Sequence, residues 1–332
     1  MKIISNNEIP VSLWNEFISR SPYESPFQSY EFYKFINSLP DFSAEAFAVS
    51  DKNELLILAV VVIKKESGIK SFFSSRGIIY GGPLIPGKDP EKLKFLIERI
   101  INHLRKKIIY LETRNYFDYS SYSDIFDELG WSFLPYLNFV INLKNKSLDD
   151  ILSGMKYNRR REIRLTLQSG VTFKECKSEE ELQTLYKILS DLYTSRVKLP
   201  LPKYHFFKAL WLSKVGKVFI VMHDSSIIGG SFCIIRPQTS IYTMYYCGFR
   251  EYDRKIFPTH IAVIAAIDYG IQNKLKYLDF MGAGIKDKEY GVRKYKQEFG
   301  GELNEYGRYR YITQPLWFKA GQFGLKLMKK FM

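Results

Sequence analysis

The stretch KYLDFMGAGIKDKEYGVRKYKQEFGGEL, residues 276–303, passes from a strand to a glycine turn and then to a helix. The apolar run 277–281 is typical of a buried strand, and the glycines within 282–284 predict a turn directly after it. Residues 290–299 have the composition of a short helix, and Gly300 and Gly301 follow it where glycine commonly ends a helix. This order of elements predicts that the stretch closes a domain built from a sheet and helices.

Three charged side chains in this stretch are candidates for chemistry. Asp279 lies on the predicted strand, where it would either hydrogen-bond the following turn or accept a proton from an attacking amine. Lys294 and Lys296 are close neighbours on the predicted helix but point to different faces of it. Spacing alone favours a solvated position for Lys296, because most lysines on a helix face water.

The second half of the chain contains the other elements of such a domain. Segments 217–223, 227–236 and 241–247 predict three antiparallel strands, and 258–273 predicts an apolar helix. The first half repeats the pattern less clearly. It has a strand pair within 45–64 around an Asp51-Lys52-Asn53 turn, then a helical stripe over 90–106 and a strand at 108–113. Helices over a mixed, mainly antiparallel sheet define an α+β class, and each half matches the layout of an N-acetyltransferase (GNAT) module.

With 332 residues, the chain has room for about two domains. We therefore predict a first GNAT-like module at 1–146 and a second at 147–314. Residues 315–332 read as a further helix in which aromatic and aliphatic residues are mixed with lysines. This helix would dock back on the first module, which is the interpretation we prefer, or lie on an anionic membrane surface.

Composition and charge restrict the function classes. Hydrophobic residues make up 46% and charged residues 25% of the chain, which is typical of a globular protein. The net charge of +14 favours anionic partners such as nucleic acid, nucleotide-linked substrates or acidic lipids, and a generic basic surface explains it equally well. The apolar run 55–63 is too short to span a membrane, and the first residues, MKIISNNEIPVSLW, lack the apolar core of a signal peptide. We expect a cytoplasmic protein that is a monomer or a weak dimer.

The sequence offers little support for metal or nucleophilic chemistry. The four histidines have no partner at metal-ligand spacing, and neither HExxH nor GxSxG occurs, so we predict no metal site. GNAT enzymes that use acetyl-CoA carry a glycine-rich turn at the start of the central helix. The corresponding residues here, 254–259 (RKIFPT), contain no glycine, which argues against a backbone cradle for the CoA pyrophosphate. We predict no tightly bound cofactor.

Four segments together resemble the Fem family of peptide-bond-forming transferases. Residues 295–300 (YKQEFG) are similar to the family's closing motif, Phe/Tyr-Lys-x-x-Phe-Gly after an Asp-containing strand and a glycine turn. Residues 27–34 (FQSYEFYK) resemble its Gln-x-x-x-aromatic opening, and residues 76–83 (RGIIYGGP) resemble its R-G-…-G-P corner. The basic helix at 158–164 (NRRREIR) resembles a further element, and the segments occur in the family's order over nearly the whole chain.

The resemblance implies two GNAT-like modules with a cleft between them. It also implies that an amino acid passes from aminoacyl-tRNA, the co-substrate, to the amine of an anionic nucleotide- or lipid-linked peptidoglycan precursor. Lys296 would contact the developing charge or the substrate phosphates, and Asp279 or Glu112 would take the proton of the amine. The residues that would bind the precursor or line the cleft are Lys34, Arg76, Arg196, Tyr245 and Tyr246.

The sequence departs from the family pattern at three places. No segment has room for the helical hairpin of the large members, so the chain resembles the short form. The first-module acid is usually Asp before Pro, whereas here Glu112 is followed by Thr113, and Pro200 stands where an aromatic residue is expected. Two other interpretations stay open: an acyl-CoA-dependent N-acyltransferase that acts on a sugar or amine, and a non-catalytic basic module that binds nucleic acid or membrane.

Overall fold

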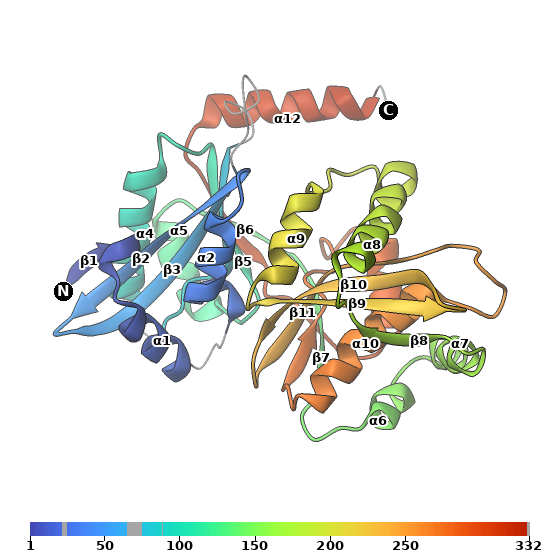
Figure 1. The fold of residues 1–332 in the computed structure, drawn as a ribbon. Helices are drawn as coiled ribbons and strands as arrows, with labels where there is room; N and C mark the ends of the chain where they lie inside the picture. The colour runs from blue at the N-terminus through green and yellow to red at the C-terminus, as the bar shows by residue number, and fades with distance from the viewer. Residues whose placement is uncertain (22–24, 65–74, 88, 331–332) are drawn as a thin grey trace. The chain divides into compact units, whose positions relative to one another are not determined.

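The chain folds as two units, each built on its own sheet (Figure 1). The computed structural model describes residues 1–21, 25–64, 75–87 and 89–330. Unit 1 comprises Met1–Tyr136 and Glu305–Met332, and unit 2 comprises Leu137–Asn304. Each unit contains one mixed seven-stranded sheet with helices against it, which confirms the predicted α+β class.

The sheet of unit 1 has the strand order β1-β2-β3-β4-β5-β14-β6, and only β4 and β5 are parallel neighbours. Its strands are β1 (Lys2–Ser5), β2 (Phe42–Asp51), β3 (Glu54–Lys64), β4 (Arg76–Gly81), β5 (Tyr110–Asn115), β6 (Ser132–Leu134) and β14 (Arg308–Ile312). Its helices are α1 (Val11–Arg20), α2 (Tyr30–Asn37), α4 (Pro90–Leu104), α5 (Ser123–Glu128) and α12 (Pro315–Lys330). The pair α1 and α2 covers one face of the sheet, and α4 and α5 cover the other (Figure 1).

Two sequence patterns of the first half form the structures that they predict. β2 and β3 pair as a hairpin, and Lys52 and Asn53 connect them with left-handed backbone, at φ 44° and 65°, as a type I′ turn requires. The helical stripe becomes the inner face of α4, which packs on the sheet. Its buried side chains are Leu93, Leu96, Ile97, Ile100 and Leu104.

The sheet of unit 2 has the order β13-β7-β12-β11-β10-β9-β8, with β11 and β12 as its parallel pair. Its strands are β7 (Asn138–Asn142), β8 (Thr172–Glu175), β9 (Gly216–His223), β10 (Ser226–Arg236), β11 (Ser240–Gly248), β12 (Tyr277–Asp279) and β13 (Glu302–Asn304). Its helices are α6 (Leu148–Ser153), α7 (Tyr157–Gln168), α8 (Glu179–Leu192), α9 (Tyr204–Leu212), α10 (Pro258–Gln272) and α11 (Gly291–Gln297). The apolar helix α10 covers one face, and α8 and α9 cover the other (Figure 1).

Each sheet also contains a strand from a distant part of the chain. β7 lies between β12 and β13 in unit 2, and β14 lies between β5 and β6 in unit 1. The division therefore differs from the predicted boundary between 146 and 147, because residues 137–146 belong to unit 2 and residues 305–314 belong to unit 1. Phe139 and Ile141 are buried in the hydrophobic core of unit 2, which holds β7 there. The predicted helix 315–332 belongs to unit 1, and its last two residues lie outside the described residues.

Candidate active site

The parallel strands β11 and β12 stay together over only part of their length. Their register pairs Ser240, Ile241 and Tyr242 with Tyr277, Leu278 and Asp279. β12 ends at Asp279, whereas β11 continues to Gly248. Among the described strands, the second half of β11 therefore has no parallel neighbour, and the sheet of unit 2 opens at this point.

A cavity of about 430 Å³ lies at this opening. One wall comes from the free half of β11 and the other from the chain after β12, and residues from the end of α8 and from α11 complete it. The lining includes Tyr193, Thr243, Tyr245, Tyr246, Phe280, Gly282, Tyr290 and Lys296. Three of the predicted site residues, Lys296, Tyr245 and Tyr246, are thus brought to one cavity within unit 2.

Lys296 is buried at the wall of this cavity, with 5% of its surface exposed. Its Nζ donates hydrogen bonds to the carbonyl oxygen of Phe280, at 2.6 Å, and to that of Gly282. An ammonium group has three N–H donors, so one remains for a ligand in the cavity. The solvated position that spacing favoured for Lys296 is wrong: Lys294 is the exposed lysine, and the face of α11 that carries Lys296 turns toward the chain after β12.

A strained turn presents the two carbonyl groups to Lys296. Met281 has a left-handed backbone, with φ 56°, and Gly282 follows with φ 102°. Asp279 Oδ1 accepts the N–H of Met281 at 2.6 Å, and Asn138 Oδ1 accepts the N–H of Gly282. Asn138 Nδ2 also donates to Asp279 Oδ2 at 2.7 Å. The structure thus confirms that Asp279 bonds the turn, and it adds Asn138, from β7, as a residue that the sequence analysis missed.

Lys296 and Asp279 are both buried, and the charge of each group affects the pKa of the other. Burial lowers the pKa of Lys296 to about 8, although the carboxylate of Asp279 opposes this shift. Burial raises the pKa of Asp279 to about 6, against the opposing effects of the Met281 N–H, Asn138 and Lys296. Between these values both groups are charged, so the site holds an ammonium and a carboxylate near neutral pH.

Stacked aromatic and charged side chains hold α11 in place. The ring of Tyr246 stacks on that of Tyr295, with centroids 5.8 Å apart and an interplanar angle of 17°. The guanidinium of the buried Arg159 lies over Tyr295 and Phe299, at 4.5 and 4.8 Å from their centroids, and donates to Glu298 at 2.5 Å. Arg159 belongs to the basic helix that the sequence analysis singled out. Its structural task is to fix the helix that carries Lys296.

His260 lies beside this stack and is held neutral. Its Nδ1 is 3.2 Å from the hydroxyl of Tyr295, and its Nε2 is 3.1 Å from Glu162. Burial, together with the neighbouring charge of Arg159, lowers the pKa of His260 to about 3. His260 therefore acts as an uncharged hydrogen-bonding group. Among the described residues, no group of three His, Cys, Asp or Glu side chains is placed to hold a metal ion.

A larger cavity, of about 1030 Å³, lies at the start of α10. It shares Arg250, Thr259 and Tyr295 with the Lys296 cavity, and the glycine-free residues 254–259 line it. The backbone there offers few N–H groups to an anion. Phe257 N–H donates to the hydroxyl of Thr166 at 3.0 Å, Pro258 has no N–H, and His260 N–H donates to the Phe257 carbonyl at 3.0 Å.

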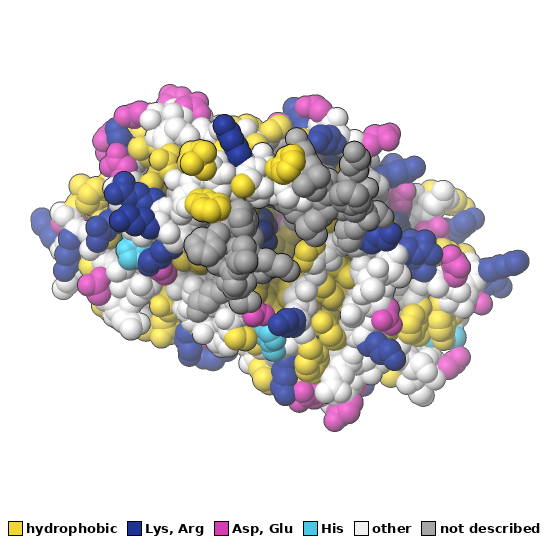
Figure 2. All heavy atoms as spheres, turned by 90° about the horizontal axis from the view of Figure 1, so that it is seen from above, with side chains coloured by type: hydrophobic (Ala, Val, Ile, Leu, Met, Phe, Trp, Pro, Cys, Tyr) yellow, Lys and Arg dark blue, Asp and Glu magenta, His cyan; other side chains and the backbone are white. Residues whose placement is uncertain are grey.

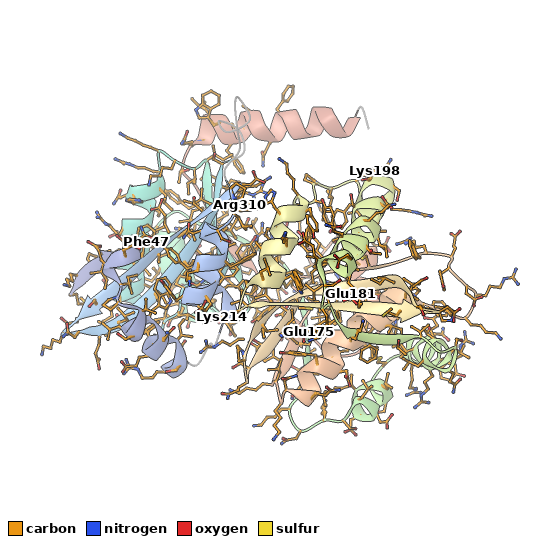
Figure 3. All side chains as sticks on the ribbon, in the orientation of Figure 1. Phe47, Glu175, Glu181, Lys198, Lys214 and Arg310 are labelled. Carbon is orange, nitrogen blue, oxygen red and sulfur yellow. The ribbon has the colours of Figure 1, made fainter. Side chains whose placement is uncertain are left out.

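Glu112, the other predicted proton acceptor, lies in unit 1 and is surrounded by arginines. Its carboxylate accepts hydrogen bonds from Arg114 Nε at 2.9 Å, Arg308 Nη1 at 3.3 Å and Arg310 Nε at 2.9 Å. Arg308 and Arg310 come from β14, and Figure 3 labels Arg310. Burial alone would raise the pKa of Glu112, but the three guanidinium groups together hold it below its ordinary value. This environment does not favour the predicted role of Glu112 as proton acceptor, because a carboxylate bound this way is a poor base.

The remaining predicted site residues do not line the Lys296 cavity as the structure describes it. Lys34, on α2, and Arg76, at the start of β4, belong to unit 1. Lys34 is exposed, with its Nζ 5.7 Å from the centroid of the Tyr30 ring. Arg196 belongs to unit 2 and lies in a π-helical turn, Tyr193–Val197, 4.0 Å from Glu251. Its precursor-binding role therefore stays a prediction, as do those of Lys34 and Arg76.

Comparisons with known proteins agree with this architecture. A family model described as an acetyltransferase (GNAT) domain matches residues 153–297, which lie within unit 2. The crystal structure of FemX matches 97% of this chain and 100% of its own, with a TM-score of 0.76 and 16% sequence identity. The chain has the tandem GNAT fold of the Fem type. The family resemblance predicted from the sequence is thus confirmed in the fold.

Two further solved structures are similar to this chain in fold. One is the tandem GNAT protein from the clavulanic acid biosynthesis pathway, with a TM-score of 0.59 and 9% identity over 94% of this chain and 99% of that chain. Another is the C-terminal domain of a putative lysylphosphatidylglycerol synthetase from Agrobacterium fabrum, with a TM-score of 0.57 and 11% identity over 90% and 92% of the chains. No match was found among curated protein sequences. The shared fold supports an acyltransferase.

Proposed function

We propose that the protein is an aminoacyltransferase of the Fem type. It would form an amide bond by transferring an amino acid from aminoacyl-tRNA to an amine of a peptidoglycan precursor, in the cytoplasm. The observation that carries this proposal is the Lys296 ammonium, held by two backbone carbonyl groups at the wall of the cavity where β11 and β12 separate. Two residues of the sequence motif that resembles the Fem family, Tyr295 and Lys296, line this cavity.

The chemistry of amide formation from an activated ester fits these groups. The amine nitrogen forms a bond to the ester carbonyl and an oxyanion develops; the oxyanion then collapses, the bond to the ribose oxygen of the tRNA breaks, and that oxygen takes up the proton that the amine loses. The free N–H of Lys296 would stabilise the oxyanion, because a preorganised cation in a buried site needs no rearrangement when the charge develops. Asp279 would act through Lys296, since one of its oxygens accepts the Met281 N–H, the other accepts the Asn138 amide, and its charge favours the ammonium.

Two observations favour aminoacyl-tRNA over acyl-CoA as the donor. At the start of α10 the N–H groups of Phe257 and His260 are bonded within the protein and Pro258 has none, so few N–H groups are left for a pyrophosphate cradle. The net charge of +14 suits a polyanionic donor and an anionic acceptor. Both observations concern this chain's own residues, and they add to the support that the family resemblance gives.

The second candidate is an acyl-CoA-dependent N-acyltransferase acting on a sugar or an amine. The cavity of about 1030 Å³ at the start of α10 favours it, because this cavity shares residues with the Lys296 cavity and has room for a nucleotide. Arg250, Arg254 and Lys255 line that cavity and could bind phosphate through their side chains instead of the backbone. A non-catalytic module is less well supported, because a purely binding surface does not require a buried lysine beside a cavity.

The proposal is tested by supplying a nucleotide-linked and a lipid-linked sugar peptide with aminoacyl-tRNAs that carry labelled amino acids. We expect label in one of the two precursors, in a bond that survives the mild alkali that hydrolyses the tRNA ester. Absence of transfer to both precursors from a complete set of aminoacyl-tRNAs would contradict the proposal.

The pH dependence of the transfer rate should be bell-shaped, with limbs near pH 6 and pH 8. Below about 6 Asp279 becomes protonated, and above about 8 Lys296 loses the charge that stabilises the oxyanion. These limbs belong to the interacting pair rather than to single residues. Asp279→Asn should move the alkaline limb to lower pH, because the carboxylate that raises the pKa of Lys296 is removed. An alkaline limb that stays in place in this variant would show that Lys296 does not produce it.

A further inference from the structure

The C-terminal helix α12 exposes large apolar side chains to solvent. The exposed fractions are 82% for Leu316, 42% for Trp317 and 65% for Phe323. Leu316, Ala320 and Phe323 follow one another at helical spacing, and all three are exposed, so they form one apolar face. Apolar residues scattered singly over a surface are ordinary, but a continuous apolar face on one helix marks a surface that binds something.

The same helix is strongly basic. The sequence from Tyr306 to the C-terminus contains no Asp or Glu, and the α12 segment contributes Lys319, Lys326, Lys329 and Lys330. Lys319 is exposed next to the apolar face. Figure 2, which views the molecule from above, shows hydrophobic and basic side chains close together on that side. A helix with one apolar face, several lysines and no acid has the composition of a helix that lies in the surface of an anionic bilayer.

The opposite side of α12 fastens it to unit 1. Phe318 packs edge-on against Tyr110 of β5, with centroids 5.8 Å apart. Gln314, directly before the helix, donates to the carbonyl oxygens of Arg105 and Ile108 at 3.2 and 3.1 Å. The apolar face is therefore presented outward by a helix whose start is fixed. We predicted that this helix docks on the first module; its start does dock there, but the face with Leu316 and Phe323 stays exposed.

We propose that α12 binds the surface of an anionic lipid bilayer and makes the protein a peripheral membrane protein. Leu316, Trp317 and Phe323 would enter the boundary between headgroups and acyl chains, and Lys319 would pair with an anionic headgroup. None of the described helices is long and apolar enough to cross a membrane, so attachment by this face would be reversible. A second copy of the chain fits less well, because two such helices would bring their lysines together. Nucleic acid fits less well, because unpaired bases could stack on Trp317 and Phe323 but would leave the exposed Leu316 without an apolar partner.

The test is co-sedimentation of the full-length protein with vesicles of phosphatidylcholine alone or mixed with phosphatidylglycerol. We expect binding to the mixed vesicles, weakening as salt is raised, and little binding to phosphatidylcholine alone. The combined variant Leu316→Ser, Trp317→Ser and Phe323→Ser should bind the mixed vesicles about tenfold more weakly or worse. Leu212→Ser is the matched control, because Leu212 is also exposed, at 66%, but lies on α9 of unit 2, and it should bind as wild type.

Three results would overturn the proposal. Equal binding to both vesicle types would show that the charge of the headgroups plays no role. Unchanged binding of the triple variant would show that the apolar face of α12 does not bind the vesicles. A concentration-dependent dimer that the triple variant abolishes, with no vesicle binding by the wild type, would identify a second copy as the occupant. The triple variant should retain the melting temperature of the wild type, since its replaced side chains are exposed. The assay measures vesicle binding without acyl transfer, so it is independent of the proposed function.

Discussion

Replacing Lys296 by methionine is expected to lower kcat/KM for acyl transfer by about 10²–10³-fold, the usual effect of removing one preorganised oxyanion donor. Methionine keeps much of the length of the buried side chain but cannot donate to the oxyanion or to the carbonyl groups of Phe280 and Gly282. The effect should fall on kcat more than on KM, because the interaction develops in the transition state. Single-turnover transfer from a saturating donor measures it.

The neighbouring lysine on the same helix supplies the control. Lys294 is exposed, and Lys294→Met should change the transfer rate less than about twofold, because an exposed charge outside the cavity does not meet the oxyanion. Equal losses in the two variants would mean that the general basic charge of α11 matters and not the Lys296 site. Thermal unfolding of both variants separates a loss of chemistry from a loss of the fold.

Replacing Arg159 by alanine should destabilise unit 2 by about 2–3 kcal/mol, because it removes a charged hydrogen bond and the packing of a buried side chain, while Glu298, which is 28% exposed, stays partly solvated. The substitution leaves Glu298 without its guanidinium partner and removes the cation from the rings of Tyr295 and Phe299. Scanning calorimetry, which can resolve separate transitions in a protein of two units, should show one transition moving to lower temperature. Transfer activity should fall as well, because α11 carries Lys296.

Arg161 is the matched control for this prediction, since it lies on the same helix, α7, but is exposed. Arg161→Ala should change the free energy of unfolding by no more than about 0.5 kcal/mol. A similar shift for both variants would contradict the assignment of Arg159 as the side chain that holds α11 in place.

Hairpins and amphipathic helices were predictable because the residue patterns that indicate them lie within short stretches of sequence. The β2–β3 hairpin follows from strand composition on both sides of a turn, and α4 follows from the spacing of its leucines and isoleucines. It was not predictable in this way that β7 joins the sheet of unit 2 and β14 joins the sheet of unit 1. Each is a five-residue strand whose partners lie far away in the sequence, so no short-range pattern reveals which sheet it joins. The predicted boundary at 146 was displaced for this reason.

The candidate site was predictable in part. The motif at 295–300 pointed to Lys296, whereas periodicity favoured a solvated lysine, because burial depends on the turn after β12 and not on spacing along α11. The role of Asp279 in the turn could be anticipated from its place at a strand end. Asn138 could not, because it reaches the turn from β7. The arginines around Glu112 could not be predicted either, since those of β14 come from the opposite end of the chain.

The central claim is that aminoacyl-tRNA is the donor. The most direct test measures which carrier, tRNA or CoA, is released during transfer. The protein is incubated with an acceptor amine and either aminoacyl-tRNA or acetyl-CoA, and free tRNA or free CoA is followed over time. We predict acceptor-dependent release of free tRNA that is lost in the Lys296→Met variant, and no release of CoA above background. Release of CoA by the wild type, with no consumption of aminoacyl-tRNA, would contradict the proposed function and identify an acyl-CoA-dependent enzyme instead.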